Sequence, residues 1–191
     1  MTAVGKIPSI TVGLRPFTPP GHGTPPAVSA LFITCSALLG GGARFVFTLE
    51  GRIDALRLPT RQAPFTTGPL WQHTCFEVFL SLPDKPGYRE FNFSPNGLWA
   101  FQRFTAYRQI DRPPDILPPH IDIRHDENIL AIDIELPADT TTQPPRFKVG
   151  LAAVIEHADG HLDYWAIHHP GEKPDFHLRE SWPLILDTRP S

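Results

Sequence analysis

The chain of 191 residues is long enough for one domain with a substantial core and too short for two comfortable ones. Hydrophobic residues make up 41 % of it and charged residues 19 %, a balance typical of globular proteins rather than disordered chains. The formal net charge of -3 indicates no basic surface for phosphate binding, so nucleic acid is not an expected partner.

The sequence predicts a protein that acts in the cytoplasm without a membrane anchor. Its first residues hold no unbroken apolar run of about 7 to 15 residues, as a secretory signal would. No stretch approaches the roughly 18 apolar residues that span a bilayer. Cys35 and Cys75 form no disulfide framework or metal motif, and we expect both to be buried reduced thiols.

Residues 1–26 are predicted to be an N-terminal arm that ends in a Pro/Gly-rich loop, because they close with FTPPGHGTPP. Residues 27–191 are predicted to form a single domain. Prolines recur between the apolar runs of this part, and a proline inside a helix removes a hydrogen bond and clashes with the preceding turn. Long helices are therefore not expected.

Hydrophobic residues from Val28 onward follow a period of two, which predicts about ten short strands. A helix at 147–156, where Ala and Leu cluster, is kept as an alternative. The spacing of the turn residues favours an all-β fold, an antiparallel β-sandwich. The segments with strand character are 28–36, 44–51, 52–59, 74–83, 88–94, 98–107, 121–125, 128–137, 147–157, 162–170 and 182–187.

The stretch REFNFSPNGLWAFQRF, residues 89–104, predicts a β-hairpin with a defined register. Proline suits the second position of a type I turn, and Gly97 tolerates the positive φ that ends a three-residue loop. This turn sets Phe93 opposite Trp99, Phe91 opposite Phe101, and Glu90 opposite Gln102. The aromatic residues then share one face, and a slip of one residue would mix them with carboxylates.

The other face of the hairpin is the candidate binding surface. It carries Tyr88, Glu90, Asn92 and Gln102, and the strand before it adds Glu77 and Phe79 if the apolar faces coincide. Carboxylates and amides beside aromatic rings suit a polyhydroxylated ligand, because rings stack on sugar C–H faces and the polar groups bind hydroxyls. A solvated outer face of the sandwich is the alternative interpretation.

The segments LWQHTCFEVFL, YREFNFSPNGLWAFQRF and YWAIHHPGEKPDFH together resemble the bacterial DOMON-like proteins related to family 9 carbohydrate-binding modules. The resemblance implies a sandwich of jelly-roll type in which two tryptophans clamp a sugar. It maps Trp71 and Glu77 onto a tryptophan-then-glutamate arrangement and makes Asn92 and Arg103 polar counterparts, although the hairpin register places Arg103 on the opposite face. The second clamp would be Trp165, with Trp182 as the alternative.

Haem and metal binding are two further alternatives. Met1 is the single methionine, so a Met/His haem site is not expected, and a pair of histidine ligands would be needed. His157 and His161 flank a predicted turn and could lie side by side, but no third metal ligand has a clear spacing. The histidines considered for either site are His157, His161, His168, His169 and His177.

A catalytic role is a further alternative. Glu77 and Glu90 could act as the carboxylate pair of a glycoside-processing enzyme. A triad of His169, Asp175 and Ser181 lacks a nucleophile-elbow pattern. The loop 168–177 is either a proline-stiffened connection or the rim of a site, with Asp175 or His177 facing the ligand.

The sequence thus predicts a module that binds a small polyhydroxylated ligand, in the first place a carbohydrate, without transforming it and without a cofactor. The predicted site consists of Trp71, Glu77, Tyr88, Glu90, Asn92, Arg103 and Trp165.

Overall fold

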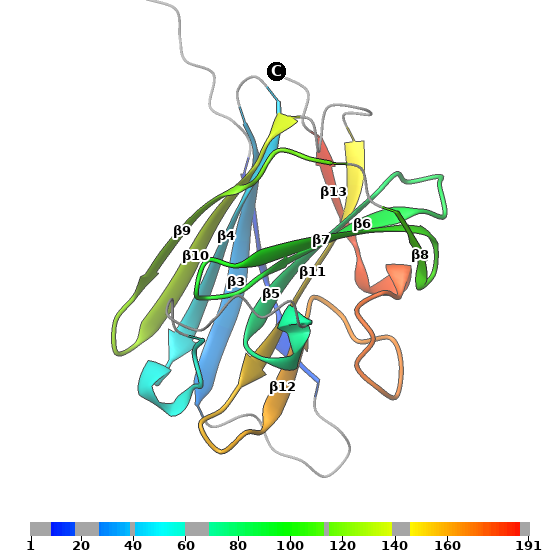
Figure 1. Cartoon of the computed structure of the whole chain (residues 1–191). Coiled ribbons are helices and arrows are strands. Elements are labelled where there is room, and N and C mark those ends of the chain that lie inside the picture. The colour runs from blue at the N-terminus through cyan, green and yellow to red at the C-terminus, as the bar shows by residue number, and fades with distance from the viewer. Residues whose placement is uncertain are drawn as a thin grey trace, which may run out of the picture.

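The computed structural model describes residues 9–17, 27–38, 41–59, 69–112, 115–138 and 146–187, and arranges them in two antiparallel sheets (Figure 1). The first sheet has five strands in the order β1-β3-β4-β10-β9. Its strands are β1 Ser9–Gly13, β3 Val28–Ala37, β4 Ala43–Gly51, β9 His120–His125 and β10 Ile129–Leu136.

The second sheet has eight strands in the order β2-β12-β11-β5-β6-β7-β8, with β13 pairing β11 off this path. Its strands are β2 Arg15–Pro16, β5 Cys75–Ser81, β6 Tyr88–Phe93, β7 Trp99–Ala106, β8 Gln109–Asp111, β11 Arg146–Glu156, β12 Leu162–Ala166 and β13 Leu184–Asp187. Three single-turn 3-10 helices connect strands: η1 Ile53–Ala55, η2 Leu70–Gln72 and η3 Arg179–Ser181.

The main core lies between the two sheets and is built by alternation along each strand. Phe45 and Phe47 of β4 are fully buried, as are Phe91 and Phe93 of β6. The Phe47 ring meets the edge of Phe76 on β5, with the ring centroids 5.2 Å apart. This packing of two inner faces confirms the predicted all-β sandwich.

The predicted hairpin register is confirmed between β6 and β7. Phe93 pairs with Trp99, Phe91 with Phe101, and Glu90 with Gln102. The turn closes as expected, because the Ser94 N–H donates to the Leu98 carbonyl at 2.9 Å and Gly97 has φ 88°. A positive φ of this size is easy for glycine and strained for most other residues.

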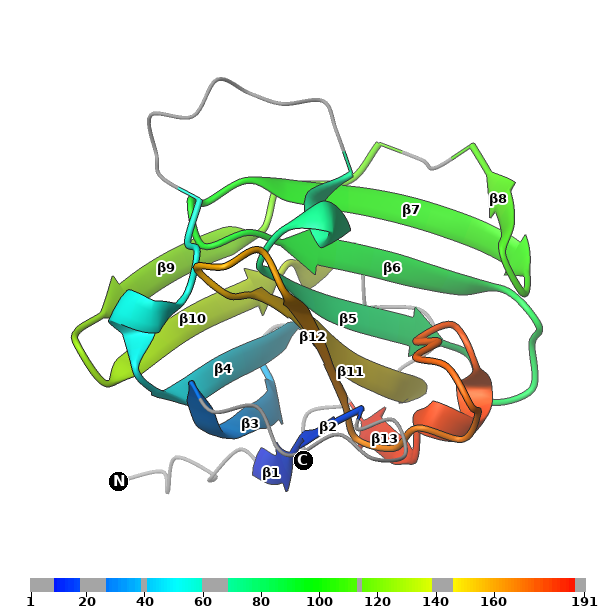
Figure 2. The ribbon, with the colours of Figure 1, turned by 90° about the horizontal axis from the view of Figure 1, so that it is seen from below.

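The second sheet also carries a small apolar cluster on its outer face. Trp182 stacks on Phe79 with 5.2 Å between the ring centroids, and its indole N–H donates to the Phe176 carbonyl at 2.8 Å. The segment that follows β12 therefore lies against this face, beside β5 and β11 in Figure 2. Both faces of β11 are thus covered, and its long Ala- and Leu-rich run forms a strand rather than a helix.

Two expectations about secondary structure are corrected, and one short strand is additional. Residues 52–59 do not form a strand: the Leu56 N–H donates to the Ile53 carbonyl and closes the single turn η1. Within the predicted arm, residues 9–13 and 15–16 pair with β3 and β12, and Leu14 is buried between them. Residues 1–8 and 18–26 lie outside the described residues. The short strand β8 was not predicted.

None of the helices that the structure describes is both long and apolar enough to cross a bilayer. Cys35 and Cys75 are free and buried, which confirms the expected thiols. Burial raises the pKa of Cys35 to about 12 and raises that of Cys75 well above its usual value.

Gly150 is predicted to be essential for the packing of Trp182. A Cβ at Gly150 would lie 2.2 Å from Trp182 Cδ1, so Gly150→Ala must displace the indole. We expect the free energy of unfolding to fall by about 1–3 kcal/mol, measured by urea denaturation. Gly13→Ala, where a Cβ has nothing within 4 Å, is the matched control. Equal unfolding midpoints for the two variants would contradict this role of Gly150.

Candidate functional site

The outer face of the second sheet contains a pocket of about 350 Å³. Its lining comes from η2, β5, β6, β7, the turn into β8 and β8 itself, β11, β12, and the segment 174–177. Its polar lining is Glu77, Glu90, Gln102, Arg108 and His177. Its aromatic and apolar lining is Trp71, Phe104, Ile110, Val154, Tyr164, Pro174 and Phe176.

Glu77 and Glu90 form a carboxyl pair on neighbouring strands. Glu77 pairs with Asn92 across β5 and β6, and Glu90 pairs with Phe79, so the two glutamates are diagonal neighbours on one face. Each is only 4 % exposed. Burial raises the pKa of Glu77 well above its usual value, and the charge of Glu90 raises it further. Burial of both carboxyls, together with the repulsion that Glu90 exerts on Glu77, favours protonation over two ionised groups.

Asn92 orients the Glu90 carboxyl from beneath the pocket. Its amide N–H donates to Glu90 Oε1 at 2.7 Å, and its carbonyl accepts the Cys75 thiol at 3.5 Å. Glu90 Oε2 is buried and has no hydrogen-bond partner among the described residues. Burial raises the pKa of Glu90, although Asn92 and the charge of Arg108 oppose that effect. The pocket therefore contains a carboxyl oxygen that the protein leaves unsatisfied.

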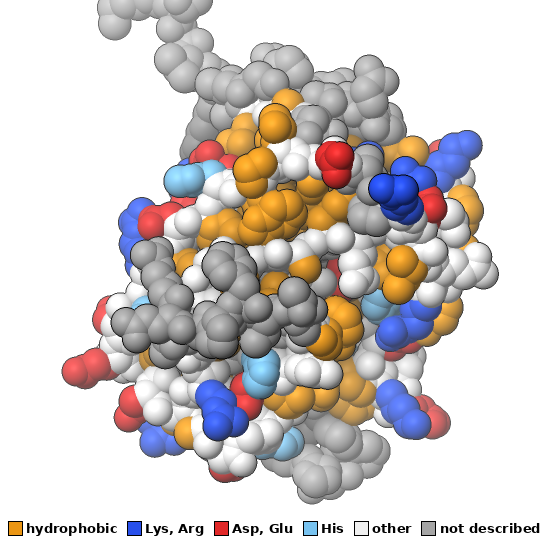
Figure 3. All heavy atoms as spheres, in the orientation of Figure 1, with side chains coloured by type: hydrophobic (Ala, Val, Ile, Leu, Met, Phe, Trp, Pro, Cys, Tyr) orange, Lys and Arg blue, Asp and Glu red, His pale blue; other side chains and the backbone are white. Residues whose placement is uncertain are grey.

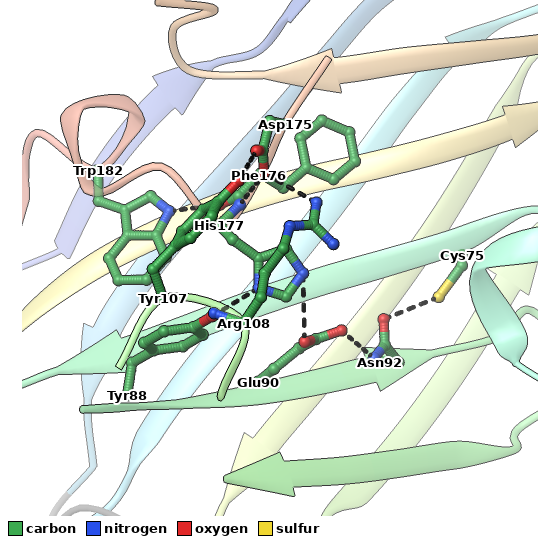
Figure 4. A network of polar contacts seen from close by, with 10 residues as sticks. All are labelled: Cys75, Tyr88, Glu90, Asn92, Tyr107, Arg108, Asp175, Phe176, His177 and Trp182. Atoms are coloured by element: carbon green, nitrogen blue, oxygen red, sulfur yellow. Dashed lines mark hydrogen bonds and ion pairs between the residues drawn. The ribbon is translucent and has the colours of Figure 1, made fainter. Parts of the chain in front are cut away.

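His177 reaches the pocket from the segment after β12 and is held by Tyr88 (Figure 4). The Tyr88 hydroxyl accepts the Arg108 backbone N–H at 3.0 Å and lies 2.7 Å from His177 Nδ1. Since the hydroxyl proton remains to donate to Nδ1, the network assigns the imidazole proton to Nε2. That atom is 3.8 Å from Glu90 Oε2, beyond hydrogen-bond distance.

Burial, followed by the positive charge of Arg108, lowers the pKa of His177 to about 4. The imidazole is therefore neutral at physiological pH and adds no positive charge to the pocket. It offers one N–H donor instead, beside the two carboxyls.

Arg108 is the cation among the described residues that line the pocket, and it is already paired. Its guanidinium donates to Asp175 Oδ1 at 2.9 Å. Asp175 also accepts the His177 backbone N–H at 3.0 Å and a hydrogen bond from the Tyr107 hydroxyl. Burial opposes ionisation of Asp175, but these contacts lower its pKa overall. The Arg108 guanidinium is thus paired with Asp175, and its charge also lowers the pKa of both glutamates without contact.

The backbone of Arg108 is in a conformation that non-glycine residues rarely adopt. Its φ is 53°, the single positive value among the described residues other than glycine. The residue lies in the tight turn between β7 and β8, where Ala106 pairs with Gln109. Such a position normally favours glycine, so this backbone outlier marks Arg108 as a candidate functional residue.

Trp71 and Tyr164 supply aromatic surface to the pocket. Trp71, on η2, is 42 % exposed, which is unusual for so large an apolar side chain. Tyr164 projects from β12 toward the outer cluster, where its ring lies 6.2 Å from that of Phe176. The two rings and the nearby Phe176 give the pocket an apolar wall above its carboxyl pair.

The structure places the seven predicted residues in three groups. Trp71, Glu77 and Glu90 line the pocket. Tyr88 and Asn92 lie beneath it, where they hold His177 and Glu90. Trp165 and Arg103 lie elsewhere, and both of these assignments are corrected.

Trp165 belongs to the main core and is only 3 % exposed, so it cannot clamp a ligand. Because alternate strand residues point to opposite faces, its neighbour Tyr164 faces the pocket instead. Arg103 is exposed and donates to Asp111 at 2.9 Å, away from the pocket. Similar exposed charges are scattered over the face drawn in Figure 3, where basic side chains lie beside acidic ones.

The histidines considered for metal binding and for catalysis lie in different parts of the structure. His157 and His161 do lie side by side, with ring centroids 5.8 Å apart, and both contact Asp163. The described residues nevertheless contain no group of three ligands arranged to hold a metal ion. The suggested triad is wrong, since His169 Nε2 contacts the Arg15 carbonyl and the Ser181 hydroxyl donates to the Leu178 carbonyl at 2.6 Å.

Two pocket residues, Arg108 and His177, could not be assigned to the site from the sequence. Arg108 carried no signal, because a tight turn without glycine is not recognisable from composition. His177 was one of two polar residues suggested for a rim, and its position against Tyr88 depends on Trp182, which anchors the preceding residue. Gln102 was predicted on the correct face.

No family model matches the chain, and no curated protein matches it significantly. Among solved structures, it is similar to "a putative carbohydrate-binding protein" from Bacteroides uniformis ATCC 8492, at 13 % sequence identity and a TM-score of 0.55. The match covers 83 % of this chain and 78 % of the other. A likeness at this identity shows a shared β-sandwich fold.

The buried carboxyl pair predicts an unusual dependence of stability on pH. The pKa values of Glu77 and Glu90 are higher in the folded state than in the unfolded chain. The protonated carboxyls do not destabilise the fold below the unfolded pKa, but stability is lost as pH rises from there through the folded pKa and the buried groups must ionise. Glu77→Gln removes the buried charge, so we expect it to raise the free energy of unfolding by about 1 kcal/mol or more at pH 8 and by less at pH 5.

Glu156→Gln is the matched contrast. Glu156 is also buried, but His73 at 2.7 Å and Arg57 at 3.0 Å lower its pKa against the effect of burial. Its stability contribution is present above the unfolded pKa, so Glu156→Gln should destabilise the protein at pH 8. Urea denaturation at both pH values measures these effects. Destabilisation of equal size by both substitutions at pH 8 would contradict the assignment.

Proposed function

We propose that this pocket binds a small polyhydroxylated ligand, a carbohydrate in the first place, without transforming it. One observation carries the proposal: an exposed tryptophan and an apolar wall stand over buried polar groups that face the same pocket. Sugars present this combination of surfaces, because their C–H faces stack on rings while their hydroxyls need hydrogen-bond partners.

The polar lining offers both donors and acceptors for hydroxyl groups. Glu77 and Glu90 supply carboxyl oxygens, and Gln102 supplies an amide. His177 Nε2 and the Arg108 guanidinium supply N–H donors from the opposite wall. A hydroxyl that replaces water at Glu90 Oε2 would satisfy an oxygen that the protein leaves without a partner.

The comparison with the Bacteroides uniformis protein supports this proposal through its fold and its description. We also propose the finer kinship with bacterial DOMON-like proteins and family 9 carbohydrate-binding modules, in a jelly-roll arrangement. The tryptophan-then-glutamate arrangement supports that kinship, since Trp71 and Glu77 do line one pocket. Tyr164 would then supply the second aromatic surface in place of a second tryptophan.

Trp71→Ala and Tyr164→Ala are expected to weaken sugar binding by about tenfold or more, because each removes an aromatic contact surface from the pocket. Isothermal titration calorimetry with a panel of mono- and oligosaccharides measures the affinities. Trp165→Phe is the control: it alters a core residue and should reduce stability while leaving the affinity unchanged.

Two outcomes of this titration would count against the proposal. Affinity unchanged in both aromatic variants, or a flat response of the wild-type protein to every sugar, would contradict sugar binding in this pocket. The bound sugar should also be recovered unchanged by chromatography. Hydrolysis products that disappear in Glu90→Gln would instead show that the carboxyl pair is catalytic.

A further inference from the structure

The charged groups of the pocket indicate the chemical class of its ligand more narrowly than a need for hydroxyl groups does. Glu77 and Glu90 are nearly fully buried on one face, and Glu90 Oε2 has no partner in the described part of the chain. A neutral hydroxyl can donate to such an oxygen but cannot balance a buried charge. When the two carboxyls are ionised, a positively charged hydrogen-bond donor stabilises them better than a neutral one.

The charge of Arg108 lowers the pKa of both glutamates, but among the described residues Arg108 forms no ion pair with either carboxyl. Arg108 faces the pair, but its guanidinium is bonded to Asp175, which is itself fixed by Tyr107 and the His177 backbone. His177 is kept neutral by burial and by Arg108. When both glutamates are ionised, the pocket therefore carries more negative than positive charge.

We propose that the pocket receives a ligand ammonium group between Glu77 and Glu90, so that its ligand is an amino sugar or a similar polyhydroxylated primary amine. This inference rests on the proposed function and deepens it. The ammonium would donate to the two carboxylates, including the unpartnered Glu90 Oε2, while the ring lies against Trp71 and Tyr164. A compact ammonium with three donors suits two acceptors on adjacent strands.

Burial raises the pKa of both glutamates, so an ammonium group that binds to the ionised carboxylates must displace the protons that they hold. The other titratable or charged groups facing the pair do not change state between about pH 5.5 and 7.5, by their shifted pKa values. Burial raises the pKa values of Cys75 and Tyr88, the pKa of His177 is about 4, and Asp175 and Arg108 remain ionised. Affinity for an amine should therefore rise with pH from about 5.5 to 6.5, where a hexosamine amine, which titrates at about 7.7 like other α-amino groups, is still mostly protonated, whereas affinity for a neutral sugar should not.

The test compares D-glucosamine, D-galactosamine and D-mannosamine with their parent hexoses and N-acetyl derivatives, by calorimetry at pH 5.5 and 6.5. At pH 6.5 we expect at least one hexosamine to bind about tenfold or more tightly than both of its neutral counterparts. Titrations in two buffers of different ionisation enthalpy should show proton release with that hexosamine alone.

Glu77→Gln and Glu90→Gln should each abolish the preference for the amine and the proton release, while the neutral hexose still binds. Two variants are used so that the test survives if one fails to fold. Glu50→Gln, at an exposed carboxylate in β4 of the other sheet, is the matched control and should behave like the wild-type protein.

Three results would overturn the inference. If the amino and neutral sugars bind equally without proton release, the ammonium site is wrong but carbohydrate binding stands. If no sugar of either kind binds, the proposed function fails as well. If Ca²⁺ or Mg²⁺ alone binds, with proton release that Glu77→Gln removes, the pair is a cation site rather than an amine site.

Discussion

The burial of two carboxyls on adjacent strands is the constraint around which the outer face of the second sheet is arranged. Glu77 and Glu90 lie out of water, and their own surroundings satisfy only part of what a charged pair requires. A buried charge without a partner is costly, and a protein that needed only stability would place apolar residues there. The cost is understandable if the pair serves a ligand, whose binding would offset the penalty that folding leaves unbalanced.

The rest of the site depends on a second packing layer that covers a sheet face usually left to solvent. Gly150 leaves room for Trp182, Trp182 holds the Phe176 carbonyl, and the next residue, His177, is thereby set against Tyr88. This layer lowers the local dielectric around the carboxyls and strengthens every charge interaction in the pocket. The same contacts position the histidine and help to bury the carboxyls, so stability and site geometry share one set of residues.

Much of the fold followed from the sequence, because strand periodicity and turn chemistry act locally. The hairpin register, the face shared by Glu77, Glu90 and Gln102, and the buried cysteines were all predictable from alternation. Contacts between segments that lie far apart in the sequence could not be predicted in this way. The covering of the outer face by the segment after β12 turned a predicted surface into a pocket, and the strained turn at Arg108 left no pattern in the sequence. Trp165 was misassigned because the resemblance pointed to a tryptophan, whereas strand alternation turns Tyr164 toward the pocket.

The most direct test of this account is a crystal structure of the protein grown with the tightest-binding hexosamine. The account predicts the ligand ammonium within about 3.2 Å of oxygens from both Glu77 and Glu90, with the sugar ring against Trp71. A sugar bound outside this pocket, or one whose amine points to solvent while the carboxyls keep their own contacts, would contradict it.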